Sequence, residues 1–398
     1  AVIVPLSAWL LRHEPRVIVT ATIFAAALPL NIAWTVLADV LTAREMFRKS
    51  AMAGFWGGLV LTFTSVAAAA AGLGAPGVAA SYLLGPLVNL LILWRVVHGL
   101  GLRVGIGGTW VRYKELLKQS RQIAVSDLVV TIRGRVEGLY VPKLLGTTAF
   151  GVLSAGSMPA SRLEGFSDGI STAHYPQIAV ADSRNDHVTA NALVSGMLSL
   201  SLLVTLPLAA TLLMLAPALA GIFYPGEALT DARELAALVM EITSIALVFG
   251  AVTLCFRDAL QAVRRFDQAA RAVRNAAIVS GIAGLGLILW LGIPGAACSY
   301  VLRNLLSACL LLPRFRSRFP GVLRALPYSR LVAPSLVIIG VALLPGFRSP
   351  GSLIHLAVVG SVLVTVGGVA TLATGIVAPG DLPFVGPVVS RMWTGGRS

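Results

Sequence analysis

The sequence predicts an all-α polytopic membrane protein, and two observations support this fold class. Of the 398 residues, 57% are hydrophobic and only 12% are charged, whereas a soluble globular chain carries roughly 25% charged residues. The apolar residues also form successive stretches long enough to cross a bilayer, which takes about 20 residues per helix. Because the apolar excess runs through the whole chain, the composition excludes a disordered chain, a disulfide scaffold and a soluble enzyme with a membrane tail.

Eleven complete membrane spans are expected, separated by glycine, proline or charge clusters. The first 11 residues are apolar but too short to cross a bilayer, so we expect them to be the end of a truncated helix. In chain order, the spans are expected near residues 17–43, 51–73, 76–94, 123–142, 150–176, 191–216, 232–256, 272–291, 294–313, 331–346 and 353–378.

The basic residues indicate how these spans are oriented. The chain has 31 Lys and Arg residues against 17 Asp and Glu residues, which gives a net charge of +14. When alternate loops are assigned to one side, 22 of the 31 basic residues, Arg257 among them, fall on the same side as the C-terminus. Basic loops are retained in the cytoplasm, so this side is expected to be cytoplasmic. Most of the charge is therefore explained by topology and needs no nucleic-acid partner.

Two pairs of similar segments indicate an internal repeat. Residues 39–47 (DVLTAREMF) match 258–266 (DALQAVRRF) at an offset of 219, and residues 74–82 (GAPGVAASY) match 292–300 (GIPGAACSY) at an offset of 218. Matching segments lie on the same side of the membrane, so the halves are expected to be parallel repeats. More residues precede the matched segments in the second half than in the first half. We therefore expect about 83 residues to be missing from the start of the first half. The intact protein is then expected to have fourteen helices.

These features predict two parallel six-helix lobes, the first one incomplete, followed by two further helices. The linker between the lobes is rich in glycine and basic residues. The expected divisions are a remnant of the N-terminal lobe at 1–98, a cytoplasmic linker at 99–121, a C-terminal lobe at 122–314, and a final helix pair with a cytoplasmic tail at 315–398.

The stretch from residue 113 to residue 178 carries the most informative motifs. A basic entry leads to a helix with an arginine and an acidic residue four positions apart, then to a Leu-Leu-Gly segment, a second glycine and a proline that is expected to end the next helix. In this chain these are Arg133 and Glu137, Leu144 to Gly146, Gly151, and Pro176. Together with the fourteen-helix architecture, the stretch resembles the multidrug/oligosaccharidyl-lipid/polysaccharide exporter superfamily, and within it the polysaccharide (O-antigen type) flippases.

The resemblance implies a MATE-like, V-shaped transporter and not an enzyme. It implies a flippase that carries an undecaprenyl-diphosphate-linked oligosaccharide from the cytoplasmic to the outer leaflet of the bacterial inner membrane by alternating access. Such a protein serves the export of cell-surface polysaccharide, for example the O-antigen of lipopolysaccharide. The implied partners are this lipid-linked substrate, membrane lipids, and the polysaccharide polymerase with its chain-length machinery; no cofactor and no nucleic acid are expected.

Three charged residues lie in the second half of the span expected at 123–142. Arg133 and Glu137 share one face of the helix, whereas Arg135 lies about 200° around from Arg133. A charge at bilayer depth costs at least about 2.5–3.5 kcal/mol, so each is a candidate functional residue. Arginine suits a diphosphate because its planar guanidinium binds two oxygens at once and stays charged when buried. The alternative is an Arg133–Glu137 pair that only fastens this helix to a neighbour.

Four more charges interrupt later spans. Arg162 precedes Glu164 and Asp168, which share a helix face at i, i+4 and repel one another. One of these two carboxyls is expected to hold a proton and to couple transport to proton movement, and the alternative is a solvated approach to the membrane edge. Arg303, beside Asn304, is expected to face the cavity from the second lobe. The candidate contacts for the diphosphate or the sugar are therefore Arg133, Arg135, Glu137, Arg162 and Arg303.

Two aspartates occupy equivalent positions in the repeats. Asp39 and Asp258 lie at the cytoplasmic ends of their spans, close to Arg44 and Arg264 respectively. Interfacial salt bridges with these arginines are the expected role, and a direct part in transport is the alternative.

Other functions are weighed against this flippase. A lipid II flippase shares the cationic cavity and the fourteen helices, whereas a drug or cation antiporter requires an acidic cavity with few arginines. From another class, an O-antigen polymerase or ligase requires a large outward loop, and the longest one here, residues 217–231, is short. The histidines and cysteines show no ligand spacing, so no metal site is expected.

Overall fold

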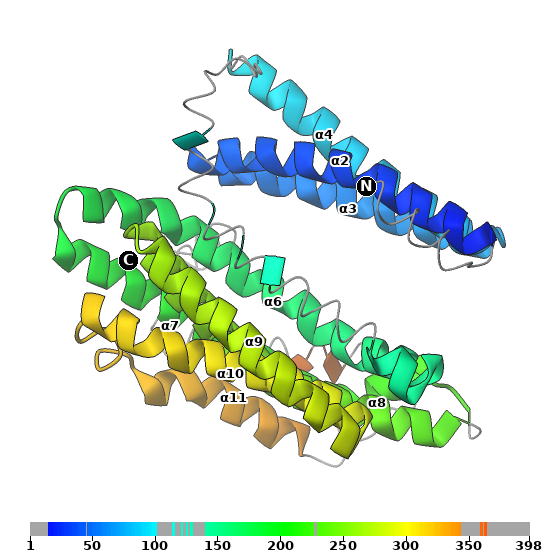
Figure 1. Cartoon of the computed structure of the whole chain (residues 1–398). Coiled ribbons are helices and arrows are strands. Elements are labelled where there is room, and N and C mark those ends of the chain that lie inside the picture. Colours follow the sequence, from blue (N-terminus) through cyan, green and yellow to red (C-terminus); the bar gives the residue numbers. More distant parts are fainter. Residues whose placement is uncertain are drawn as a thin grey trace, which may run out of the picture. The chain divides into compact units, whose positions relative to one another are not determined.

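The protein divides into two compact helical units, Ala1–Thr109 and Trp110–Ser398 (Figure 1). The computed structural model describes residues 15–44, 46–101, 140–226 and 229–343, with isolated positions at 114–115, 121, 125, 128–129, 359–360 and 362–363. The division after Thr109 falls inside the linker expected at 99–121. The four divisions given above remain a prediction, and each unit is described by itself.

The described part of the first unit consists of three helices. These are α2 (Pro15–Ala43), α3 (Phe47–Ala70) and α4 (Gly74–Gly99). α4 packs along both α2 and α3, which touch each other only slightly. Leu37 and Leu41 of α2 and Leu93 and Val97 of α4 form its buried core.

The described part of the second unit has six helices around one larger core. α8 packs against α6, α7 and α10, while α9 packs mainly on α10 and α11 on α7. A stack of aromatic rings closes this core at one end, with Phe256 and Phe315 centroids 4.2 Å apart and Phe315 and Phe319 centroids 5.2 Å apart. The six helices are α6 (Thr147–Ser183), α7 (His187–Phe223), α8 (Thr230–Ala262), α9 (Phe266–Leu291), α10 (Ile293–Arg318) and α11 (Tyr328–Ala342).

The repeat seen in the sequence is also present in the helix packing. In both units the third helix of the repeat, α4 or α10, lies between two helices that hardly touch each other. Gly74 and Gly292, which start these third helices, have φ angles of +62° and +67°, a conformation that glycine adopts without steric cost. The serine two turns later is buried in both copies, Ser81 at 2% exposed and Ser299 at 1%.

Seven helices of the described residues are long and apolar enough to cross a membrane: α2, α3, α4, α7, α8, α9 and α10. α6 is 37 residues long but more polar, and α11 has only 15 residues. The spans expected at 123–142 and 353–378 fall largely outside the described residues. Large apolar side chains such as Phe63 and Trp290 are 70% and 81% exposed, which suits surfaces that face lipid.

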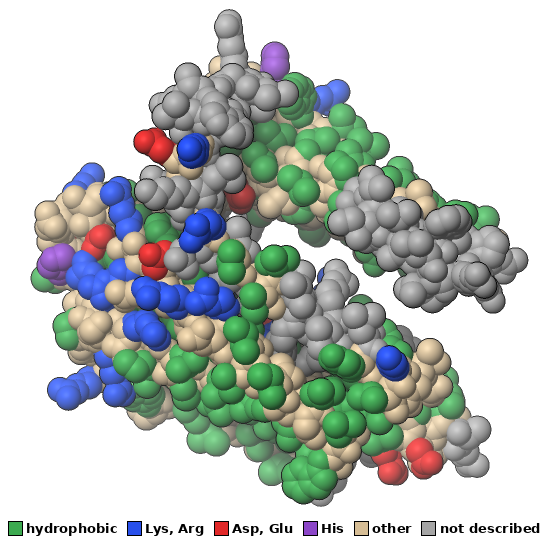
Figure 2. Space-filling view, in the orientation of Figure 1, with side chains coloured by type: hydrophobic (Ala, Val, Ile, Leu, Met, Phe, Trp, Pro, Cys, Tyr) green, Lys and Arg blue, Asp and Glu red, His purple; other side chains and the backbone are tan. Residues whose placement is uncertain are grey.

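Basic side chains gather at one end of the second unit. Figure 2 shows Lys and Arg side chains concentrated there and apolar side chains over much of the remaining surface. Arg318, in the last turn of α10, pairs at this end with Asp182 in the last turn of α6. This segregation agrees with the separation of basic loops from apolar spans in the sequence.

The close approach of α9 and α10 gives a test of the fold. A Cβ atom on Gly295 would lie 2.0 Å from the backbone oxygen of Leu287, whereas a Cβ on Gly286 would meet nothing within 4 Å. We expect Gly295→Ala to destabilise the protein by about 1–3 kcal/mol, the usual cost of overpacking, and Gly286→Ala to melt like wild type. Thermal melting of the purified protein in detergent measures both; equal melting temperatures for the two variants would contradict this packing.

Candidate functional site

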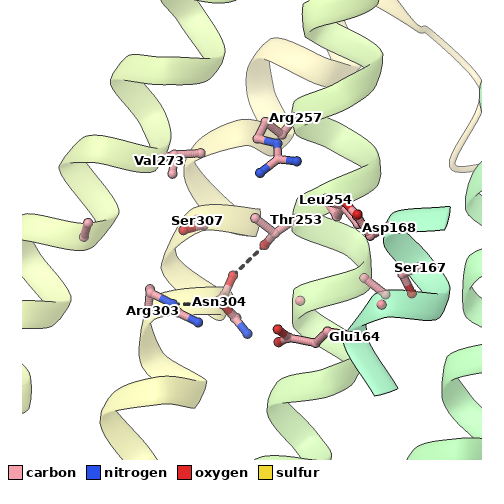
Figure 3. Close-up of a pocket in the computed structure, with 14 residues that line it drawn as sticks. Glu164, Ser167, Asp168, Thr253, Leu254, Arg257, Val273, Arg303, Asn304 and Ser307 are labelled. Carbon is pink, nitrogen blue, oxygen red and sulfur yellow. Dashed lines mark hydrogen bonds between the residues drawn. The ribbon is translucent and has the colours of Figure 1, made fainter. Parts of the chain in front are cut away.

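A cavity of about 400 Å³ with charged and polar side chains in its wall lies in the second unit, between α6, α8, α9 and α10 (Figure 3). Its wall combines two carboxylates with two guanidinium groups and several neutral polar side chains. The polar residues that matter most are Glu164, Asp168, Thr253, Arg257, Arg303 and Asn304.

One group of contacts joins Glu164 on α6 to two residues of α10. The Tyr300 hydroxyl donates a hydrogen bond to Glu164 Oε1 at 2.5 Å. The Arg303 guanidinium lies over the Tyr300 ring, with Cζ 4.3 Å from the ring centroid, and such a cation–π contact is favourable when it is shielded from water. Tyr300 therefore links the carboxylate of one helix to the arginine of another.

Asn304 fastens α10 to α8 beside this group. Its side-chain Nδ2 donates a hydrogen bond to the backbone carbonyl of Ala246 at 3.0 Å, and its backbone carbonyl oxygen accepts one from Thr253 Oγ1 at 2.9 Å. Its Oδ1 accepts a hydrogen bond from Arg303 Nε at 3.2 Å. Because its hydrogen bonds hold Asn304 in place, the arginine beside it is held as well (Figure 3).

A glycine on α8 gives Glu164 its room. A Cβ atom on Gly250 would lie 3.0 Å from Glu164 Oε1 and 3.2 Å from Asn304 Nδ2. Any larger residue there would compete with both polar side chains for the same space, so the glycine permits α6 to bring its carboxylate close to α10.

A second group of contacts lies around Asp258 on α8, which is only 8% exposed. Asp258 Oδ1 accepts a hydrogen bond from Arg257 Nε at 2.7 Å, and Oδ2 accepts one from Ser171 Oγ of α6 at 2.7 Å. The interfacial salt bridge expected with Arg264 is thus replaced by a salt bridge with Arg257, the residue directly before Asp258. Arg257, which is among the basic residues expected to mark the cytoplasmic side, also lines the cavity.

This arrangement is suited to holding polar groups among membrane-spanning helices. Each charge in the cavity wall has an oppositely charged or hydrogen-bonding neighbour, which reduces the large cost of keeping it away from water. Among the described residues, no group of three His, Cys, Asp or Glu side chains could hold a metal ion.

The structure brings together three of the residues predicted from the sequence and separates a fourth. Glu164, Asp168 and Arg303 all line the cavity. Arg162 is exposed on α6 and is not part of the cavity wall. The remaining candidates, Arg133, Arg135 and Glu137, lie outside the described residues.

Sequence reasoning missed Arg257, Tyr300 and Asn304 as members of the site. One signal was available, because the repeat partners of Arg257 and Arg303 are Ala38 and Gly85. A charge present in only one of two repeats is not required by the fold that the repeats share. Tyr300 gave no such signal, since its repeat partner is also a tyrosine.

Comparisons with known proteins agree with this fold. Residues 1–232 match the model of a family described as polysaccharide biosynthesis protein. No curated protein matches the chain in sequence. Among solved structures, the chain resembles lipid II flippase MurJ in an inward closed conformation, with a TM-score of 0.62 and 15% identity over 90% of this chain and 73% of that one.

Two crystal structures of MATE are also similar. The one in complex with MaL6 has a TM-score of 0.66 and 13% identity, over 81% of this chain and 77% of that chain. The one in the bent conformation has a TM-score of 0.62 and 13% identity, over 81% and 76%. At these identities the likeness shows the fold alone. It confirms the predicted all-helical membrane fold, and with the family match it confirms the superfamily resemblance.

The Tyr300–Glu164 contact can be tested by stability. Tyr300→Phe removes the hydrogen bond to the carboxylate but keeps the ring beneath Arg303, and a hydrogen bond to a charged group is worth about 1.5–3 kcal/mol. We expect a clear fall in the melting temperature of the purified protein. Its repeat partner supplies the matched control: Tyr82 packs its ring 5.0 Å from that of Phe24, a contact that Tyr82→Phe retains. An equal change in melting temperature for Tyr300→Phe and Tyr82→Phe would contradict a stabilising hydrogen bond between Tyr300 and Glu164.

Proposed function

Because the chain belongs to the polysaccharide biosynthesis protein family, we propose that it is a flippase for an undecaprenyl-diphosphate-linked oligosaccharide. It moves this lipid from the cytoplasmic to the outer leaflet of the bacterial inner membrane, with its own C-terminus in the cytoplasm, for export of cell-surface polysaccharide such as O-antigen. The observation that carries the proposal is the family match over residues 1–232, on a chain whose fold is that of membrane transporters. A polysaccharide polymerase and its chain-length machinery are the proposed partners.

The physical task explains why charged residues within the membrane are needed. Flipping breaks no bond, but it moves a diphosphate and many hydroxyl groups across about 30 Å of hydrocarbon. Charged groups cross only where protein groups replace the lost water. In this proposal Arg133, Arg135 and Glu137 contact the head group, together with Arg162 and Arg303, as the two lobes open alternately to either side.

The carboxylates of α6 are the proposed coupling groups. Glu164 and Asp168 are one helical turn apart in the wall of the same cavity, and two carboxylates at this spacing favour uptake of a proton. Proton binding and release there would drive the return of the empty carrier. The contact of Glu164 with Tyr300 supports this role, because it connects the state of the carboxyl to the packing of α10.

A lipid II flippase is the second candidate. The similarity to lipid II flippase MurJ extends over 90% of this chain, and lipid II also combines a polyprenyl diphosphate with sugars. The cationic residues argue against a drug or cation antiporter. A polymerase or ligase is least favoured, since α7 and α8 are joined by a short connection, Tyr224–Leu229.

Substitution of the arginines tests the proposed head-group contacts. Arg133→Ala and Arg135→Ala, made in the full-length protein, are expected to abolish surface polysaccharide while the protein still reaches the membrane, because the diphosphate loses its counter-charges. Surface polysaccharide is detected with a specific antiserum. Arg324→Ala, an exposed arginine outside the site, serves as the control. Normal polysaccharide in both variants would exclude this role, and rescue of cells depleted of their lipid II flippase would favour the second candidate.

Proton coupling is tested with the carboxylates. Glu164→Gln and Asp168→Asn remove the titratable groups with little change in shape, so flipping should become insensitive to the proton gradient. The measurement is the accumulation of outward-facing lipid-linked oligosaccharide in membrane vesicles, with and without an uncoupler. Wild-type flipping that ignores the uncoupler would eliminate these residues as proton carriers.

A further inference from the structure

The side chain of Arg257, like that of Arg303 beside Asn304, turns back to the next residue of its own helix. Adjacent side chains on a helix point in different directions and do not normally face each other. Nevertheless, Arg257 Nε lies 2.7 Å from Oδ1 of Asp258, the very next residue. The arginine side chain must therefore turn back toward its neighbour, and this contact restricts where its guanidinium group can lie.

Asp258 is itself fixed by another helix. Its second oxygen, Oδ2, accepts a hydrogen bond at 2.7 Å from Ser171 of α6, a residue that is 0% exposed. An ionised carboxylate this deeply buried is tolerated only when its oxygens are bonded. Asp258 is consequently an anchor with one oxygen committed to α6 and the other to Arg257.

Arg257 carries this restraint into the cavity. Its side chain is 37% exposed and lines the same wall as Asp168, and Figure 3 shows the two residues on neighbouring helices. Asp168 is attracted electrostatically by Arg257 and repelled by Asp258. The Arg257 side chain therefore forms part of the cavity wall while its Nε is bonded to Asp258.

The first repeat lacks this device. Position 38, which corresponds to Arg257, is an alanine, and Asp39, which corresponds to Asp258, is exposed. The buried aspartate accompanies the arginine and is not a requirement of the repeat fold.

We infer that Arg257 contacts oxygen atoms of the polar head group during transport, and that Asp258 and Ser171 are positioning residues that act through Arg257. The inference rests on the proposed flippase function, since it names further residues of the same site. A guanidinium held in place loses less conformational entropy when it binds oxygens than one that is mobile. Without Ser171 or Asp258, Arg257 would still be charged but no longer held.

A double-mutant cycle tests this dependence, because residues that act through one another give non-additive effects. The full chain is reconstituted in proteoliposomes, and the flipping rate of a fluorescent undecaprenyl-diphosphate-linked oligosaccharide is measured. We expect Asp258→Asn to lower the flipping rate at least tenfold and Ser171→Ala to lower it several-fold. Ser171→Thr keeps the hydroxyl group and should flip at the wild-type rate. In the Arg257→Ala background, neither Asp258→Asn nor Ser171→Ala should lower the rate more than twofold further.

Controls separate positioning from folding. Ser280 of α9 is also fully buried but bonds only to its own helix, at the Ala277 carbonyl, so Ser280→Ala should flip at the wild-type rate. If Asp258→Asn does not fold, Ser171→Ala carries the cycle alone, and its melting temperature is measured beside its rate. Loss of stability without loss of rate, or effects that multiply in the double variants, would overturn the inference. A wild-type protein that does not flip this lipid would overturn the proposed function, and the inference with it.

Discussion

The exclusion of water from the membrane interior is the constraint on which the second unit depends. Every charged side chain placed there must find its partner within the protein, and the contacts around Asp258 and Glu164 are two solutions to this problem. In the first, a serine and an arginine share the two oxygens of one carboxylate. In the second, a tyrosine hydroxyl meets the carboxylate and an arginine covers the same aromatic ring. Both solutions join α6 to another helix, so polar satisfaction and helix packing are achieved by the same contacts.

The two repeats show how a shared architecture permits local specialisation. The glycine that starts α4 or α10 has a positive φ in both copies, and the serine in the second turn of the helix is buried in both. The charges are not retained, because the positions in the first repeat that correspond to Arg257 and Arg303 are Ala38 and Gly85. The two arginines of the site are therefore not part of what the repeats share.

Much of the fold and part of the site could be predicted from the sequence. Apolar stretches locate most helices, since hydrophobic length is set by the bilayer, and Glu164, Asp168 and Arg303 are conspicuous as charges within such stretches. Arg257 could not be distinguished in this way, because it lies near the end of a span, where arginine usually marks the cytoplasmic side. Tyr300 is neutral, and its role depends on a contact with Glu164, 136 residues earlier in the chain. Arg162 lies only two residues before Glu164, and two residues along a helix turn a side chain to another face.

The position of α10 between α8 and α9 has a consequence for biosynthesis. Helices enter the membrane in the order in which the ribosome makes them, and a domain is completed only when its last contacts form. Ser171, Arg257 and Asp258 belong to α6 and α8, so their network can assemble while α10 is still being translated. Glu164 must wait for Tyr300. The newly inserted chain therefore passes through a stage in which one carboxylate of α6 is without its α10 partner.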